Sequence, residues 1–301
     1  MSARRLIALT ALLALVAPFS ARLEAAQPAG ENERGEPTTE KTELPVETYP
    51  RHVPRKVSAQ PGEHLVYHIA WVGIPSGRAE LAAKWIEKVG AEGHDCLYVT
   101  CQTRSNAFSG FFYPVKTDVA SLIDVEGTFS RQFDIDKNEG RHHAKENIRF
   151  DYDRRRADYV RFKPGPYKPQ EQTAAVRLWD KVQDPLSCLY YMRHLDLRVG
   201  DEVPMIVNSA KRNWVMQINV LRREKLRTSA FGELTTFRVQ PEVSFPGIFV
   251  RKGKMTIWLE EKTKIPVKMT VDVPIGSVTV TLADAENAPL VPLSRKAEPA
   301  E

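Results

Sequence analysis

The chain has 301 residues, of which 42% are hydrophobic and 27% charged, and its formal net charge is +5 at pH 7. These values are ordinary for a globular protein and allow a sizeable core, in one large β domain or in two smaller ones. They give no support to a nucleic-acid partner, which would require a concentrated basic face.

Residues 1–26 contain the three parts of a secretory signal peptide. Arg4 and Arg5 precede an apolar run over residues 6–17, and small residues follow at Ala25 and Ala26. The run is shorter than the roughly 20 residues that span a bilayer, and no later stretch is longer. Removal of residues 1–26 takes away three Arg and one Glu and leaves a net charge of +3.

This signal predicts export to the periplasm or the medium. The rest of the twin-arginine pattern is missing, so we expect the ordinary Sec route. No Cys lies near the cleavage zone, which excludes a lipid anchor on a new N-terminal Cys. We therefore expect a soluble mature protein without a transmembrane segment.

Residues 27–58 are rich in Pro, Glu and Thr and nearly free of large apolar residues. Such a segment cannot bury enough surface to offset its ordering entropy. We interpret it as a disordered linker whose last residues, 49–57, can lie along the folded domain.

Short runs with β character follow, separated by Gly, Asp or Asn. They are HLVYHIAW (64–71), RAELAAKWIEKV (78–89), CLYVTCQT (96–103), KTDVASLID (116–124), TFSRQFDID (128–136) and NIRFDYD (147–153). The pattern predicts an all-β, mostly antiparallel fold over residues 59–284.

Helical signals are few. The best lies in DPLSCLYYMRHLDLRVG, where Asp184 suits an N-cap, Pro185 suits the first helical position and Gly200 closes the unit. Residues 106–114 are expected to hold at most a short helical turn. The sequence thus predicts one short inserted α-helix.

Five segments of the second half match segments of the first at a nearly constant offset. GEHLVYHI aligns with GDEVPMIV, AEGHDCLY with SAFGELTT, AFSGFF with SFPGIF, TDVASLID with KMTIWLE, and FSRQFDID with PVKMTVDV. We interpret residues 59–151 and 200–284 as two copies of one β unit, which pair as a closed barrel or pack as a sandwich. A helix-bearing insert (152–199) joins them and a flexible tail (285–301) follows. The alternative is that all β meanders look alike at this level.

The mature chain keeps three cysteines, an odd number for an exported protein. Cys96 and Cys101 point to opposite faces of one strand, so a bridge between them is not expected. A bridge from either to Cys188 is one interpretation, and three buried free thiols is the favoured one.

GEHLVYHIAWVGIPSGRAEL resembles the signature of an exported bacterial family, domain-of-unknown-function family 3108. The segments SGFFYPVKT, DPLSCLYYMRHLDLRVGD and the stretch from FGELTTFRV to SVTVTL resemble it too, in the same order. The resemblance covers about residues 62–282. It implies an all-β exported protein and supplies no catalytic residue.

The turn after the first strand is crowded with special residues. Gly73 and Gly77 permit backbone angles closed to other residues, and Pro75 fixes one dihedral angle between them. The structural interpretation is a hairpin that sets strand register. The functional one is a turn at a barrel mouth, with Trp71 and Tyr67 facing a ligand.

No metal or nucleotide motif is complete. His64 and His68 share one face of a strand, whereas His142 and His143 point to opposite faces, and neither pair supplies the three or four ligands that a metal needs. No glycine-rich phosphate loop occurs. We therefore expect no cofactor.

Nucleophilic catalysis has little support. Ser76 lies in IPSG, which is not the G-x-S-x-G elbow, and Cys188 lies among apolar residues of the predicted helix. Carboxylate pairs occur at Asp134/Asp136, Asp151/Asp153 and Glu260/Glu261. Two carboxyls across a sugar cleft would allow glycosidase chemistry, but solvent-facing strand residues are the default interpretation.

The densest charge lies in residues 141–168, which also contain interleaved Tyr and Phe. We interpret this segment as a solvated hairpin with DRRRAD at its turn. The alternative is a basic patch for anionic headgroups or other envelope polyanions.

These observations favour a non-enzymatic exported protein that binds an apolar or amphipathic envelope ligand, or a protein partner, in or beside a β-barrel. The alternatives are a hydrolase of cell-wall or glycan material and a structural assembly protein without a ligand. The candidate ligand-binding residues are Tyr67, Trp71, Ile74, Leu186, Tyr190 and Arg193.

Overall fold

The computed structural model describes residues 50–59, 62–89, 93–140, 142–163, 170–245, 248–249, 255–273 and 275–296. The signal-peptide interpretation and most of the linker interpretation lie outside these residues.

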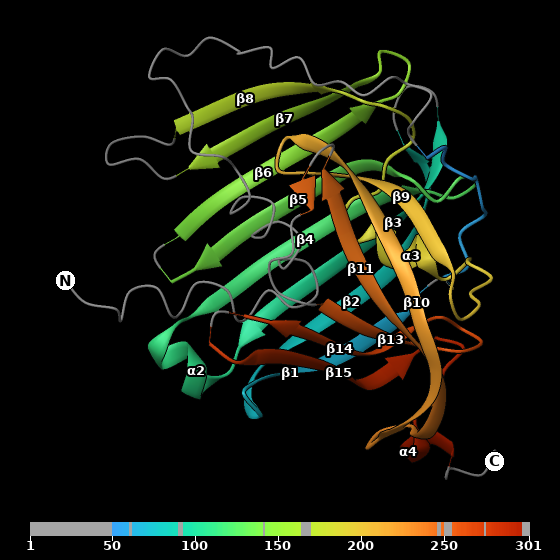
Figure 1. Ribbon diagram of the computed structural model, residues 1–301. Coiled ribbons are helices and arrows are strands. Elements are labelled where there is room, and N and C mark those ends of the chain that lie inside the picture. Colours follow the sequence, from blue (N-terminus) through green and yellow to red (C-terminus); the bar gives the residue numbers. More distant parts are fainter. Residues whose placement is uncertain are drawn as a thin grey trace.

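Among the described residues, fifteen strands form one antiparallel sheet made of two meanders (Figure 1). The first consists of β1 (His64–Trp71), β2 (Ile74–Val89), β3 (His94–Ser105), β4 (Val115–Asp124), β5 (Ser130–Glu139), β6 (His142–Asp151), β7 (Arg156–Lys163) and β8 (Gln170–Arg177). The second consists of β9 (Glu202–Ser209), β10 (Arg212–Thr228), β11 (Gly232–Phe245), β12 (Ile248–Phe249), β13 (Met255–Glu260), β14 (Pro266–Asp272) and β15 (Ser277–Glu286). The described part of the chain also contains three short helices: α2 (Ala107–Phe112), α3 (Ser187–Met192) and α4 (Leu293–Lys296).

The two meanders join where β1 pairs with β15, and β8 and β9 lie at the two ends of the strand order. Figure 1 shows β9, β10 and β11 crossing in front of the first meander, so the sheet curls back over itself. β8 and β9 are not paired with each other. The connection between them makes one isolated parallel bridge to β9, between Gln183 and Val207. The predicted all-β, mostly antiparallel fold is confirmed, as a barrel-like sheet that is not closed.

Alternation along the strands separates an inner from an outer face. In β3, the side chains of Leu97, Val99 and Cys101 are fully buried, whereas Thr100 is half-buried and Gln102 is exposed. Successive side chains of a strand point to opposite faces, so the buried set faces the enclosed core. The polar set forms the outer surface.

The β1–β2 hairpin turns at Val72 and Gly73, whose φ angles are 50° and 78°. Two consecutive positive φ angles define the tight turn that matches strand twist. Gly77 does not adopt a positive φ, contrary to our expectation. It is required instead because a Cβ there would lie 2.4 Å from the carbonyl oxygen of Arg104 on β3. Pro75 pairs with Ala70 just after the turn, and the next residue, Ser76, is the extra residue of a bulge.

The successive strands of the two halves correspond in order: β1, β3, β4 and β5 of the first half match β9, β11, β13 and β14 of the second. The insert differs from its description above, because β7 and β8 extend the first meander before α3 begins. The β6–β7 turn is formed by residues 152–155, so the DRRRAD segment begins in this turn and continues into β7. Internal duplication remains a prediction.

Ordered contacts occur at both ends of the predicted β domain. Val57 donates a backbone hydrogen bond of 2.8 Å to the carbonyl of Val125, and Ala59 is buried. At the C-terminal end, Ala285 and Leu290 are buried, and Leu293 of α4 donates a backbone hydrogen bond of 2.8 Å to the carbonyl of Ala230. The flexible tail stays a prediction.

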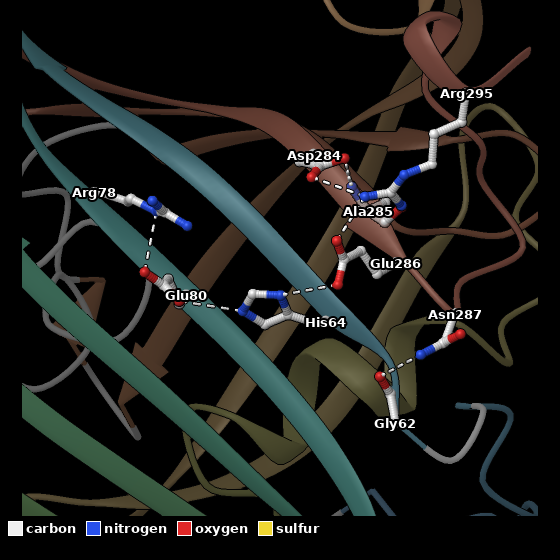
Figure 2. Close-up of polar contacts among 9 residues, drawn as sticks. All are labelled: Gly62, His64, Arg78, Glu80, Asp284, Ala285, Glu286, Asn287 and Arg295. Carbon is white, nitrogen blue, oxygen red and sulfur yellow. Dashed lines mark hydrogen bonds and ion pairs between the residues drawn. The ribbon is translucent and has the colours of Figure 1, made fainter. Parts of the chain in front are cut away.

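Charged side chains reinforce this C-terminal closure (Figure 2). Arg295 of α4 contacts Glu286 at 2.6 Å, and the ring of His64 lies 3.9 Å from Glu286 and 3.2 Å from Glu80. Arg78 continues the series, 3.1 Å from Glu80. The series therefore connects α4, β15, β1 and β2 across the seam between the two meanders.

Candidate functional site

The segment that leads into α3 is fixed by one buried carboxylate. Asp184 Oδ1 accepts hydrogen bonds from the backbone N–H groups of Leu186 and Ser187, at 2.7 and 2.8 Å. Its Oδ2 accepts from the hydroxyls of Ser121 on β4 and Ser130 on β5. Burial raises the pKa of Asp184, and these hydrogen bonds act against that shift. Asp184 thus caps the first turn, although the regular helix begins at Ser187, two residues later than expected.

An ion pair fixes the other end of α3. The guanidinium of Arg193 forms two hydrogen bonds with the carboxylate of Glu63, at 2.7 and 2.9 Å, and the two side chains are only 4% and 1% exposed. Because charge-assisted bidentate pairs are strong and specific, this contact ties α3 to the start of β1.

Four of the six candidate ligand-binding residues lie in this sealed region. Tyr67, Leu186 and Tyr190 are at most 2% exposed, and the Arg193 guanidinium lies 5.4 Å from the centre of the Tyr190 ring. Burial raises the pKa of the Tyr67 and Tyr190 hydroxyls. They have no hydrogen-bond partner among the described residues. The surroundings of α3 therefore fit a packed core that holds the fold.

The opposite end of the sheet carries α2, whose large side chains face solvent. Phe108, Phe111 and Phe112 are 62%, 84% and 71% exposed, and the Phe112 ring contacts the other two edge to face. Asn106 anchors the helix: its side chain accepts from Ser109 N at 2.8 Å and donates to the Pro75 carbonyl at 2.7 Å. The three rings are thus presented by a fixed helix.

The other two candidate residues lie beside this helix. Trp71 is half-buried and donates to the carbonyl of Ile275 at 2.9 Å, and Ile74 is 49% exposed. Val72 lies against Gly276, which brings the β1–β2 and β14–β15 turns together. Half of the twelve exposed large apolar side chains among the described residues gather here. We call this set the α2 rim: Val72, Ile74, Phe108, Phe111, Phe112 and Ile275.

A row of basic side chains crosses the outer face just below the α2 rim. Strand register places His68, Arg78, Arg104 and Lys116 side by side on β1, β2, β3 and β4. Arg104 lies two residues before Asn106, so this basic row is about 7 Å from the start of α2. Arg78 and Arg104 are paired with Glu80 and Asp118. The region combines apolar and cationic surface.

The next two rows of the outer face form a groove of about 420 Å³ across β3–β7. One row runs Gln102, Asp118, Asp136, Lys145, Phe162 and the other Thr100, Ala120, Asp134, Asn147. Tyr98 completes the β3 side. The Asp134/Asp136 pair noted in the sequence therefore faces a hollow of mixed polar and aromatic character.

The remaining candidates are not assembled into a site. Cys96, Cys101 and Cys188 are free and buried, as favoured above, and burial raises the pKa of Cys101 to about 12. Ser76 is buried and donates to the carbonyl of Ile74 at 2.8 Å. Within the described ranges no group of three His, Cys, Asp or Glu could hold a metal ion. No helix there is long and apolar enough to cross a membrane.

The model of one protein family matches residues 66–283, which include the β1–β2 hairpin, α2, α3 and most of the sheet. The chain belongs to the family described as "Protein of unknown function (DUF3108)". The match confirms the resemblance noted in the sequence. No curated protein matches the chain.

Two solved structures are similar to this family member. A β-barrel-like protein of the domain of unknown function DUF1849 from Brucella abortus is 12% identical, with a TM-score of 0.48 over 78% of this chain and 99% of that one. A "putative lipoprotein" from Parabacteroides distasonis is also 12% identical, with a TM-score of 0.34 over 77% and 99%.

Sequence reasoning missed the exposed phenylalanines. AFSGFF was noted only as a repeat segment and as part of the family signature, because a cluster of Phe ordinarily predicts core. The available signal was its position: a link of only nine residues, 106–114, between two paired strands leaves no path into the interior.

Proposed function

We propose that this protein is a non-enzymatic, exported envelope protein whose α2 rim binds the apolar part of an amphipathic lipid. The exposure of Phe108, Phe111 and Phe112 carries the proposal. Leaving a Phe side chain in water forgoes roughly 1.5–3 kcal/mol of burial free energy, so three on one short helix are costly unless something covers them. Large exposed apolar patches mark interaction sites.

The basic row favours a lipid with an anionic headgroup over a protein partner. Arg78 and Lys116 are exposed beside the apolar rim, so an acyl chain against α2 would place its headgroup near positive charge. Aromatic side chains beside cations are typical of surfaces that bind membrane interfaces. Each Lys or Arg near an anionic lipid surface adds about 1 kcal/mol of attraction.

The contacts in the outer groove argue against the hydrolase alternative. Asp118 contacts Arg104 at 2.5 Å, Asp136 contacts Lys145 at 2.8 Å, and Asp134 accepts from the amides of Gln132 and Asn147. Each of these carboxyls is already held by a cationic or an amide donor. The groove suits binding better than cleavage.

Flotation with phosphatidylglycerol-containing and pure phosphatidylcholine vesicles tests the proposal. We expect the protein to float with the anionic vesicles, and the double variant Phe111→Ser/Phe112→Ser to lose at least tenfold in partitioning. Leu221→Ser is the matched control, since Leu221 is 44% exposed away from the rim. Failure of the wild type to bind either vesicle, or equal binding by the double variant, would overturn the proposal.

A further inference from the structure

The groove on the outer face of β3–β7 has the floor and walls of a site for a hydroxyl-rich chain. Five strands spaced about 4.8 Å apart span roughly 19 Å. Thr100, Ala120, Asp134 and Asn147 lie in one register row across β3–β6. A ligand lying across the strands would therefore meet one of these side chains at each strand.

The polar groups of the floor retain hydrogen-bonding capacity. Asp134 accepts hydrogen bonds from the side-chain amides of Gln132 and Asn147, and Asp136 contacts Lys145 at 2.8 Å and the Asn138 amide at 3.0 Å. An ionised carboxylate has about four acceptor positions, so each can accept further hydrogen bonds. Thr100 and Gln102 add groups that both donate and accept.

Aromatic rings stand at both sides of the groove. Tyr98 on β3 is half-buried, and Phe162 on β7 is 40% exposed. Ala120 keeps the middle of the floor low. Flat rings beside hydroxyl, amide and carboxylate groups suit sugar rings, which have apolar faces and polar edges.

From this geometry we propose that the groove binds a sugar chain without cleaving it. Its three aspartates exceed its one lysine, which favours neutral or amino sugars over acidic ones. The acidic linker, residues 27–49, is an unsuitable occupant for the same reason. A peptide strand is also a poor fit, because the groove lies on the face of the sheet, where the strands' backbone groups are already paired.

The groove lies one register row beyond the basic row, on the same face. A glycolipid could therefore place its acyl chains at the α2 rim, its anionic group on the basic row and its sugars in the groove. This extension rests on the proposed function, whereas sugar binding by the groove alone does not. The sugar can come from a glycolipid or from a free glycan.

Calorimetry with the hexasaccharide of β-1,4-linked N-acetylglucosamine and flotation with lipopolysaccharide-containing vesicles test the proposal. Tyr98→Ala/Phe162→Ala, and separately Ala120→Arg, should weaken sugar binding at least tenfold. Arg149→Ala, on the same face outside the groove, should leave it unchanged. Phe111→Ser/Phe112→Ser should retain hexasaccharide binding even if vesicle binding is lost.

The two ligand sources give different results. If a groove variant loses only the extra binding to vesicles that lipopolysaccharide provides, the ligand is a glycolipid. If it loses hexasaccharide binding, the ligand is a glycan chain as such. The proposal fails if the wild type shows neither effect, if the groove variants bind like wild type, or if shorter sugars are released. The proposal would also be overturned if a lysine-rich peptide bound in the groove and the hexasaccharide did not.

Discussion

α2 and α3 have the same length and opposite surroundings. All six residues of α3, SCLYYM, are buried, whereas none of α2, AFSGFF, is buried. Both segments are apolar, so hydrophobicity alone does not separate a core helix from a surface helix. The difference comes from the connections, and it assigns stability to one end of the sheet and binding to the other.

The connection of each helix explains its place. β3 and β4 remain paired from Cys96 and Asp124 to Arg104 and Lys116, so the short link containing α2 must stay at the end of that hairpin. α3 instead joins the two ends of the strand order, β8 and β9, and this crossing runs inside the curled sheet.

Removal of the buried cation at the α3 end should have the largest effect. Arg193→Ala leaves the Glu63 carboxylate buried without its partner, which costs about 3–5 kcal/mol. Urea denaturation should show this loss in the free energy of unfolding. Arg198→Ala, whose pair with Asp196 is 80% and 88% exposed, should change it by less than about 0.5 kcal/mol. Equal effects would refute the structural role of the α3 end.

The α2 end contains one position that should matter for folding. Gly77→Ala places a Cβ against the Arg104 carbonyl and forces β2 and β3 apart, with an expected cost of about 2 kcal/mol or more. Gly73→Ala meets open space and carries only the cost of its positive φ, about 1 kcal/mol. Thermal unfolding should show a lower midpoint temperature for Gly77→Ala than for Gly73→Ala. The opposite result would mean that the positive φ of the turn costs more than the close approach of β2 and β3.

Acid should weaken the α3 end. Burial, with Arg193 and Arg55 nearby, lowers the pKa of His194 to about 4 from an ordinary value of 6.5. Between these values the unfolded chain binds more protons than the folded one, so stability falls as pH drops from 6.5 towards 4. We expect His194→Gln to make the loss of unfolding free energy between pH 6.5 and pH 4 smaller by about 1 kcal/mol. The effect is modest because the ring is partly exposed. An unchanged slope would contradict the assignment.

The apolar side chains of α2 should contribute least to stability. Phe111→Ser/Phe112→Ser removes rings that are 84% and 71% exposed, so the free energy of unfolding should change by no more than about 0.5 kcal/mol. Chemical denaturation beside the vesicle assay measures it. A loss of several kcal/mol would mean that α2 supports the core.

Much of the sheet could be predicted from local pattern. The alternation in HLVYHIAW and NIRFDYD correctly indicates half-buried strands, and the short link after Trp71 correctly indicates a hairpin. The reason given for Gly77 was wrong, because close approach of another strand is a tertiary fact. The buried tail at Leu290 depends likewise on where β15 and α4 meet.

The candidate site was harder to predict than the fold. Tyr67, Tyr190 and Arg193 have the residue types of a binding site, yet the curl of the sheet buries them with Glu63 as the partner. The groove depends on register, because only pairing aligns Asp134 with Ala120 and Asn147 on neighbouring strands.

The most direct test of the account is a polarity-sensitive dye placed on α2. Phe111→Cys offers an exposed thiol, whereas the native cysteines are buried and free, so a thiol-reactive dye should label the new position selectively. With phosphatidylglycerol-containing vesicles, we predict a blue shift and increased emission at position 111 and no change for the control Leu221→Cys. An unchanged spectrum at position 111, or equal changes at both positions, would contradict the assignment of the α2 rim as the lipid-binding surface.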